Sequence, residues 1–204
     1  MFYIADRKTL SVKVQAPFVA AEIRALRSSI FKNTTEVVQA LAVAAAVEQR
    51  YDLTRVDLFL PVLDTFCAIL DPLAGSLLRG TLRRIGHEVF PALIFVLGIA
   101  PSDVKAAMGL KEPADLIRSI CGYYSQCVVG PEAGALTPMV APGGPGGPGG
   151  IGVTDTSMMP CQLQMGVFTG AGAMTRMFRE SALTEKRCRA KGDPACVYEF
   201  NFSY

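Results

Sequence analysis

The sequence predicts an α+β fold in which a helical N-terminal part packs on a small antiparallel sheet. Apolar residues recur at helical spacing up to residue 127, whereas the residues after 150 form short alternating segments around one helix. Half of the 204 residues are hydrophobic and only 19% are charged, so the chain can bury a substantial core. Helices first and strands later is the element order expected of an α+β protein.

The N-terminal part is expected to contain three helices after a short strand or extended arm. Apolar spacing predicts a helix over residues 16–32 and a second helix after residue 36. A third helix is expected after Asp57, with Pro61 in its first turns. We expect residues 1–70 to form a helical extension packed on a main domain that spans residues 71–204.

The main domain is expected to open with a helix that begins near Ala74. The apolar stripe of this helix consists of Leu78, Leu82, Ile85 and Val89. Pro91 should kink or end the helix, because proline removes a backbone hydrogen bond and its ring clashes with the preceding turn. A further helix is expected over residues 114–127, with Pro113 at its start.

The C-terminal part combines a loop, a helix and a hairpin. Residues 142–152 are rich in proline and glycine, which is typical of a mobile insertion between two strands, although a lid or docking loop remains an alternative. A strand that ends at Cys161 should follow, and then a helix from about Leu163 to Arg179. The breaker cluster Gly192-Asp193-Pro194 predicts the turn of a final hairpin.

Composition limits the partners and the compartment. The net charge of +2 gives no reason to expect a nucleic-acid partner. The most apolar run, from Val89 to Ala100, is shorter than the roughly 20 residues of a membrane span, and the longer run over residues 58–78 is interrupted by two aspartates. Asp6 and Arg7 interrupt any signal peptide. We therefore expect a cytoplasmic protein without a transmembrane segment. In that compartment the six cysteines are expected to be core residues or metal ligands rather than disulfides.

The final hairpin carries possible metal ligands. Cys188 and Cys196 flank its turn, and Glu185 precedes Cys188 by three residues. On a regular strand Glu185 and Cys188 would point to opposite faces, so a shared metal requires a bulge or an irregular strand entry. Zinc needs four ligands, and Cys161 is the natural candidate for the fourth. The spacing alone leaves both interpretations open, a metal site or a hairpin with two core cysteines.

From Cys161 onward the chain resembles the 4-vinyl-reductase domain family. The residues that carry the resemblance are CQLQMG, the small-residue helix GVFTGAGAM and the final segment EKRCRAKGDPACVYEF. The family is named for a bacteriochlorophyll biosynthesis protein. It includes phenol-sensing domains of bacterial regulators, and it shares its fold with subunits of the TRAPP vesicle-tethering complex. The Pro/Gly-rich insertion departs from the compact strand connection of the family.

The resemblance implies a zinc ion held by three cysteines and one glutamate. Carried over by motif, the ligands are Cys161, Glu185, Cys188 and Cys196. Four protein ligands leave no open position for water, so such a site is structural rather than hydrolytic.

Several aromatic residues and the single histidine are candidates for an apolar ligand pocket. His87 can ligate a pigment magnesium or hydrogen-bond a phenol, but it can equally be an ordinary surface histidine. The aromatic candidates, which can also be plain core residues, are Phe90, Phe95, Tyr123 and Tyr124. Cys67, Cys121 and Cys127 have no metal-like spacing and are expected in the core.

Non-catalytic binding of a hydrophobic aromatic or tetrapyrrole-type molecule is the leading functional hypothesis. No phosphate-binding loop, dinucleotide fingerprint or nucleophile elbow is present in the sequence, so we do not expect an enzyme. One alternative is a role in vinyl reduction during bacteriochlorophyll biosynthesis. Another is a homodimeric assembly or tethering subunit, and the resemblance implies a homodimer in either case.

Overall fold

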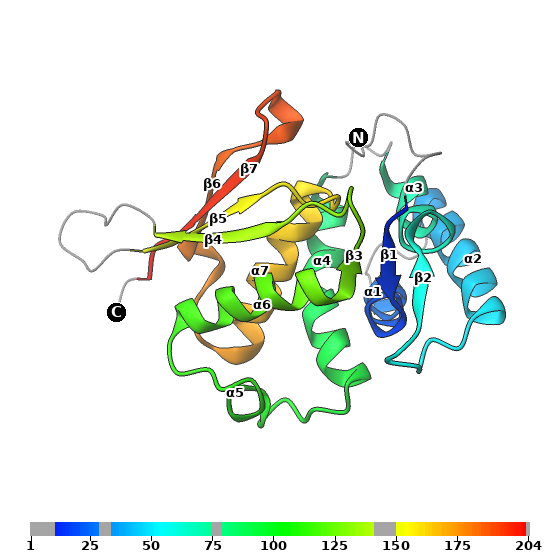
Figure 1. Ribbon diagram of the computed structural model, residues 1–204, viewed down its shortest axis with the longest axis horizontal. Coiled ribbons are helices and arrows are strands. Elements are labelled where there is room, and N and C mark those ends of the chain that lie inside the picture. The colour runs from blue at the N-terminus through cyan, green and yellow to red at the C-terminus, as the bar shows by residue number, and fades with distance from the viewer. Residues whose placement is uncertain (1–10, 29–33, 75–78, 141–149, 203–204) are drawn as a thin grey trace.

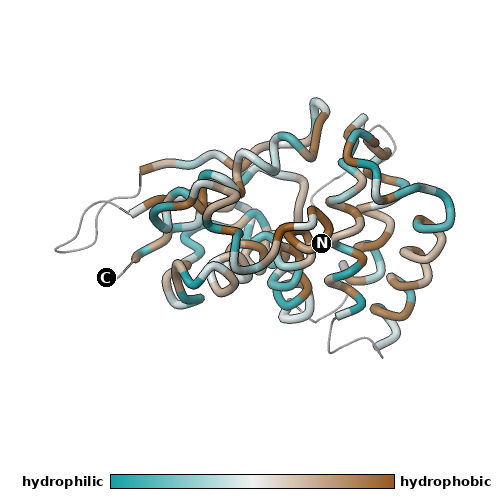
Figure 2. The backbone as a smooth tube through the Cα atoms, turned by 90° about the horizontal axis from the view of Figure 1, so that it is seen from below, coloured by the Kyte–Doolittle hydropathy of each residue, from teal (hydrophilic) through white to brown (hydrophobic). Residues whose placement is uncertain are grey.

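Helices pack against two small antiparallel sheets in this chain (Figure 1). The computed structural model describes residues 11–28, 34–74, 79–140 and 150–202. This arrangement confirms the predicted α+β class. In Figure 2, apolar and polar stretches alternate along the helices, as expected of helices with one buried face.

The elements follow one another in a simple order. The helices are α1 (Ala16–Ser28), α2 (Thr35–Arg50), α3 (Phe66–Ala74), α4 (Arg79–Val96), α5 (Val104–Ala107), α6 (Pro113–Cys127) and α7 (Cys161–Thr175). The strands are β1 (Lys13–Gln15), β2 (Phe59–Pro61), β3 (Val128–Val129), β4 (Leu136–Val140), β5 (Ile151–Asp155), β6 (Leu183–Arg187) and β7 (Cys196–Phe200). Short 3₁₀ turns occupy Val62–Asp64, Glu180–Ala182 and Arg189–Lys191.

The first sheet joins the N-terminal segment to the end of α6. Its strand order is β2-β1-β3, and Val14 on β1 pairs with Leu60 on one side and Val128 on the other. The predicted helix around Pro61 is wrong, because this residue lies in β2 and the helix begins only at Phe66. Proline is tolerated there because β2 is an edge strand of this sheet.

Helices α4 and α7 cross closely at the centre of the molecule. Ile85 and Val89 of the predicted stripe are buried and Leu82 is partly buried, whereas Leu78 lies outside the described residues. Pro91 does not end the helix, since α4 continues to Val96. Glycine permits the close approach, because a Cβ atom at Gly170 would lie 2.0 Å from the carbonyl oxygen of His87.

The second sheet has the strand order β4-β5-β7-β6. Alternate residues of β7 are buried as predicted, and its aromatic rings pack on Phe168 of α7, whose ring centroid lies 5.2 Å from that of Phe200. Most of the predicted Pro/Gly-rich loop, residues 142–149, lies outside the described residues. Its predicted end at residue 152 is wrong, because β5 begins at Ile151 and pairs with both β4 and β7.

The boundaries of α7 differ from the prediction at both ends. Cys161 does not end a strand; it is the first residue of the helix, after Pro160 at the N-cap position. The helix ends at Thr175 because Arg176 takes a left-handed conformation, with φ at 55°. Other predicted features, the strand before residue 11 and the helix over residues 29–32, fall outside the described residues.

We expect Gly170→Ala to destabilise the protein by about 1–3 kcal/mol, because the added methyl group collides with the α4 backbone. Gly122→Ala is the matched control. It replaces a helical glycine with no atom within 4 Å of the added Cβ and should stabilise the protein by about 0.5–1 kcal/mol. Urea denaturation measures both changes. Equal effects of the two substitutions would contradict the close packing of α4 on α7.

Candidate metal centre and apolar cavity

The β6–β7 hairpin contains a bulge beside its turn. Glu185 pairs with Tyr198 and Arg187 pairs with Val197, so the register shifts by one residue between them. A bulge inserts one extra residue, here Lys186, and reverses the alternation of side chains beyond it. Glu185 and Cys188 can therefore face the same side although three positions separate them.

Four side chains converge at this place from three segments of the chain. Cys196 begins β7, Cys188 directly follows the bulged strand β6, and Cys161 comes from the first turn of α7. One ligand atom from each of these cysteines and from Glu185 lies within 4.8 Å of the others. All three thiols are buried. This cluster can hold a metal ion, and it contains the four residues predicted from the sequence.

The carboxylate of Glu185 fits a cation at this place. Its Oε1 atom is buried and has no hydrogen-bond partner, which is costly for a carboxylate oxygen unless a further group binds it. Its Oε2 atom lies 3.8 Å from Nζ of Lys191 at the surface. A metal ion among the sulfur atoms would give the buried oxygen a partner.

The thiols also interact with one another. The Sγ atoms of Cys161 and Cys196 lie 2.8 Å apart, and the backbone N–H of Arg189 donates to Cys196 Sγ at 3.4 Å. The hydrogen bond from Cys161 lowers the pKa of Cys196 to about 5, whereas the same contact raises the pKa of Cys161. Burial raises the pKa of Cys188. A bound metal ion would stabilise the thiolate forms of these cysteines.

A buried polar network lies directly behind the cluster. Nη2 of Arg189 donates to the carbonyl oxygen of Met159 at 3.2 Å and lies 3.6 Å from the Asp155 carboxylate. That carboxylate also accepts hydrogen bonds from the Tyr198 hydroxyl at 3.1 Å and from the Ser157 N–H at 2.7 Å. Burial nevertheless raises the pKa of Asp155 to about 6. The network ties the hairpin to the segment that leads from β5 into α7.

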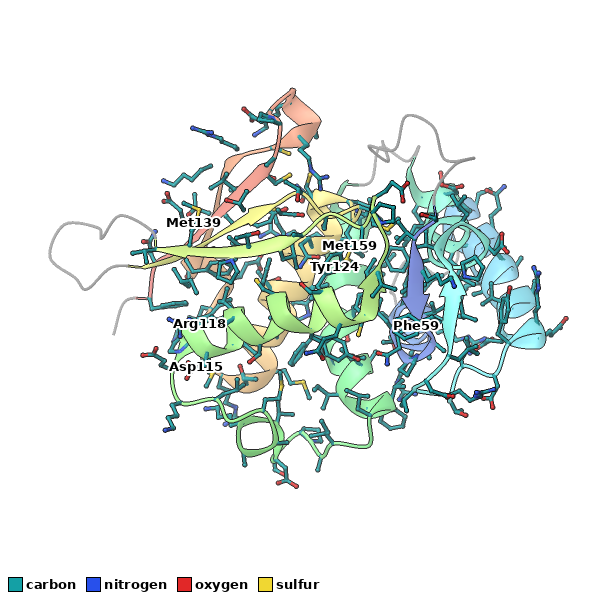
Figure 3. All side chains as sticks on the ribbon, viewed as in Figure 1. Phe59, Asp115, Arg118, Tyr124, Met139 and Met159 are labelled. Atoms are coloured by element: carbon teal, nitrogen blue, oxygen red, sulfur yellow. The ribbon has the colours of Figure 1, made fainter. Side chains whose placement is uncertain are left out.

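An apolar cavity of about 130 Å³ includes Met159 of that segment in its lining. Met159 and Tyr124 lie next to each other in its wall (Figure 3). The Tyr124 hydroxyl donates to the carbonyl oxygen of Ala133 at 2.6 Å and accepts the Met158 N–H at 3.4 Å. The lining comes from α1, α4, α6, α7, β4, the segments on either side of α5 and the segment before α7. It consists of Phe18, Val89, Phe90, Leu93, Ile94, Leu97, Ile99, Met108, Ile120, Tyr123, Tyr124, Leu136, Met159, Gln164 and Val167.

Of the five residues predicted for a pocket, the structure brings Phe90, Tyr123 and Tyr124 together around this cavity. His87 does not line it; this residue faces a separate, open hollow beside the end of α7. Phe95 is 62% exposed, and the guanidinium of Arg24 lies 3.6 Å from its ring centroid.

Two parts of this region were not predicted from the sequence. Gln164 lines the cavity. The sequence could have indicated it as a candidate, because it is a polar residue among apolar neighbours in a helix that is buried on almost all sides. Asp155 and Arg189 form the buried ion pair behind the cluster that can hold a metal ion. No local sequence pattern predicts this ion pair, because the two residues are distant in sequence and are brought together only by strand pairing.

The remaining cysteines behave as predicted. Cys67, Cys121 and Cys127 are buried in the core, and burial raises the pKa of Cys121 to about 12. Within the described residues, no helix combines the length and apolarity that a membrane crossing requires.

Comparison of the chain with known protein families, with curated proteins and with solved structures finds no match.

We expect the purified chain to contain one metal ion per molecule and Cys188→Ser to lose it, because the substitution removes one of the four donors. Loss of the ion should also lower the melting temperature, since binding free energy at such a site stabilises the folded state. Elemental analysis and thermal denaturation measure the two effects.

Cys121→Ser is the matched control, because it removes a buried thiol that lies outside the cluster. It can reduce stability through packing but should retain the metal. A wild-type chain that is free of metal and fully stable would contradict the assignment.

Proposed function

We propose that the protein is a non-catalytic binding module for a small hydrophobic aromatic molecule, with a structural zinc ion that holds the wall of the binding cavity. The observation that carries this proposal is the position of the apolar cavity. Met159 lines the cavity, and its carbonyl oxygen accepts a hydrogen bond from Arg189, the residue next to Cys188.

The donor set supports zinc. Three thiolates and one carboxylate supply four ligands of the types that zinc prefers, and a closed set of four is typical of structural rather than catalytic sites. When bound, the ion supplies cross-linking of the hairpin to α7. Cys161 contributes the helix end of this link, and Cys188 and Cys196 contribute the hairpin end.

The volume of the cavity favours a ligand with one aromatic ring. An engineered protein cavity of about 150 Å³ lined by aliphatic and aromatic side chains binds benzene. The cavity here, at about 130 Å³, is of similar size and has a similar lining. A tetrapyrrole contains four linked rings, so this volume supports the aromatic member of the two ligand classes suggested by the sequence.

The lining supports binding rather than chemistry. The cavity wall combines aliphatic side chains with the rings of Phe90, Tyr123 and Tyr124, which suits an apolar ligand held mainly by burial of its surface. No lysine, histidine, aspartate or glutamate contributes to the lining among the described residues. The only acidic protons of the wall that these residues form are therefore the Tyr123 and Tyr124 hydroxyls, and this wall offers no charged nucleophile.

We expect wild-type protein to bind toluene, with a rise in melting temperature that grows with toluene concentration, because a ligand that binds only the folded state stabilises it. Ile120→Trp should abolish this rise by filling the cavity with an indole ring. Val38→Trp, at a position on α2 that is 53% exposed, should leave it unchanged.

Calorimetric titration with toluene checks the same expectation directly. Absence of binding to the wild type, or equal binding to wild type and Ile120→Trp, would refute the proposed function.

A further inference from the structure

An open hollow of about 850 Å³ lies beside the end of α7 and shares no lining residue with the apolar cavity. Its wall comes from α4, from the end of α7, from the segment that leads into β6 and from the residues after β7. Apolar side chains, among them Met177 and Phe202, lie in this wall next to charged and polar ones. The hollow therefore offers both kinds of surface to one ligand.

The wall also carries two positive charges that no neighbouring group balances. Arg176 and Arg179 both line the hollow, and both are exposed. Among the residues that the structure describes, neither guanidinium forms an ion pair. Glu180 lines the same hollow but is already paired, because its Oε1 atom lies 2.9 Å from Nη2 of Arg83. An anion would supply the missing counter-charge.

Arg176 occupies a backbone position at which glycine is the usual residue. It directly follows α7, and its φ of 55° is left-handed. No other non-glycine residue in the described ranges has a positive φ. A Cβ atom is unfavourable in this conformation, so glycine would be the more stable choice after the helix. Fold stability therefore does not account for the arginine, which favours a role for its side chain.

The end of α7 opposes an anion less than a free helix end does. The carbonyl oxygens at a helix C-terminus carry partial negative charge, which disfavours an anion nearby. Here the N–H groups of Arg176 and Met177 donate to the carbonyl oxygens of Ala173 and Gly172, at 3.2 Å and 3.1 Å. The two guanidinium groups therefore dominate the charge of this part of the wall.

We infer that this hollow is a second binding site, and that it takes a phosphate monoester with a small apolar group. A phosphate monoester carries a charge of about −1.5 to −2 at pH 7, which matches two guanidinium groups, whereas a carboxylate carries a single charge. The planar fork of arginine also fits phosphate oxygens. Met177 and Phe202 supply apolar surface for the rest of the ligand.

NMR titration of the amide chemical shifts at low ionic strength tests this inference with four probes. Phenyl phosphate has the double charge and the ring, benzoate has a single charge, dimethyl phenyl phosphate is neutral, and inorganic phosphate lacks the ring. We expect phenyl phosphate to bind most tightly, about tenfold more tightly than the neutral ester, and to shift the amides of residues 173–182. Added salt should weaken its binding, because exposed charges are screened.

Arg176→Gly and Arg179→Gln should each weaken phenyl phosphate binding about three- to fivefold, since each removes one of the two charges. Arg176→Gly should also raise the melting temperature by about 2–4 °C, because glycine relieves the left-handed backbone. A purely structural arginine would give the opposite shift. Arg187→Gln is the matched control, because it removes an exposed arginine of β6 that does not line the hollow. It should change the affinity less than twofold.

The outcomes separate the parts of the inference. Absence of phenyl phosphate binding, equally tight binding of the neutral ester, or an equal loss of affinity in Arg187→Gln would overturn the site. Benzoate binding as tight as phenyl phosphate binding would overturn the phosphate assignment, and inorganic phosphate binding as tight would overturn the apolar group. If Arg176→Gly destabilises the fold, the affinity of Arg179→Gln decides. Failure of this site leaves the proposed function standing, because the apolar cavity has a different lining.

Discussion

The bulge between Glu185 and Arg187 is the constraint on which the metal cluster depends. In a regular strand the side chains of Glu185 and Cys188 would point to opposite faces. The extra residue reverses this alternation and turns both toward Cys196 on the neighbouring strand. The helix then needs to supply only one donor, and Cys161 does so from its first turn.

The cluster is also linked to the interior of the molecule. Arg189 follows Cys188, pairs with Asp155 and donates to the backbone of Met159, whose side chain lies in the cavity wall. Gln164 is one helical turn from Cys161 and lines the same cavity. Met159 and Gln164 thus connect the wall of the cavity to the cluster that can hold a metal ion. This arrangement links the cluster that can hold a metal ion to the wall of the apolar cavity.

Much of this organisation can be predicted from the sequence, and the misses share a physical cause. Apolar periodicity located the main helices, and the residue types of the C-terminal segment, read together with the expected resemblance, named the four residues that converge in the cluster. The sequence showed only that a shared metal site would require a bulge or an irregular strand entry. It did not predict the bulge itself, because strand register depends on cross-strand pairing rather than on local preference. The strand at Pro61 was missed for the same reason, since its pairing partner β1 lies far away in the sequence.

The residues of the cavity wall likewise could be predicted only in part from local sequence patterns. Phe90 and Phe95 are both aromatic residues of α4, but only Phe90 shares a helix face with Leu93, Ile94 and Leu97, which line the cavity. Both phenylalanines were predicted as pocket residues because they are aromatic, but they point to different faces of the helix. Gln164 was not predicted because its place in the cavity wall can be recognised only once the cavity itself is known. That space is formed by elements from both halves of the chain.

Hydrogen exchange with and without a metal chelator tests the central claim most directly, namely that the metal holds the hairpin and, through it, the cavity wall. The account predicts that chelation increases amide exchange in β6, β7 and residues 157–161, while β1, β2 and β3 keep their protection. Unchanged exchange in the hairpin after the metal is removed, or an equal increase in both sheets, would contradict it.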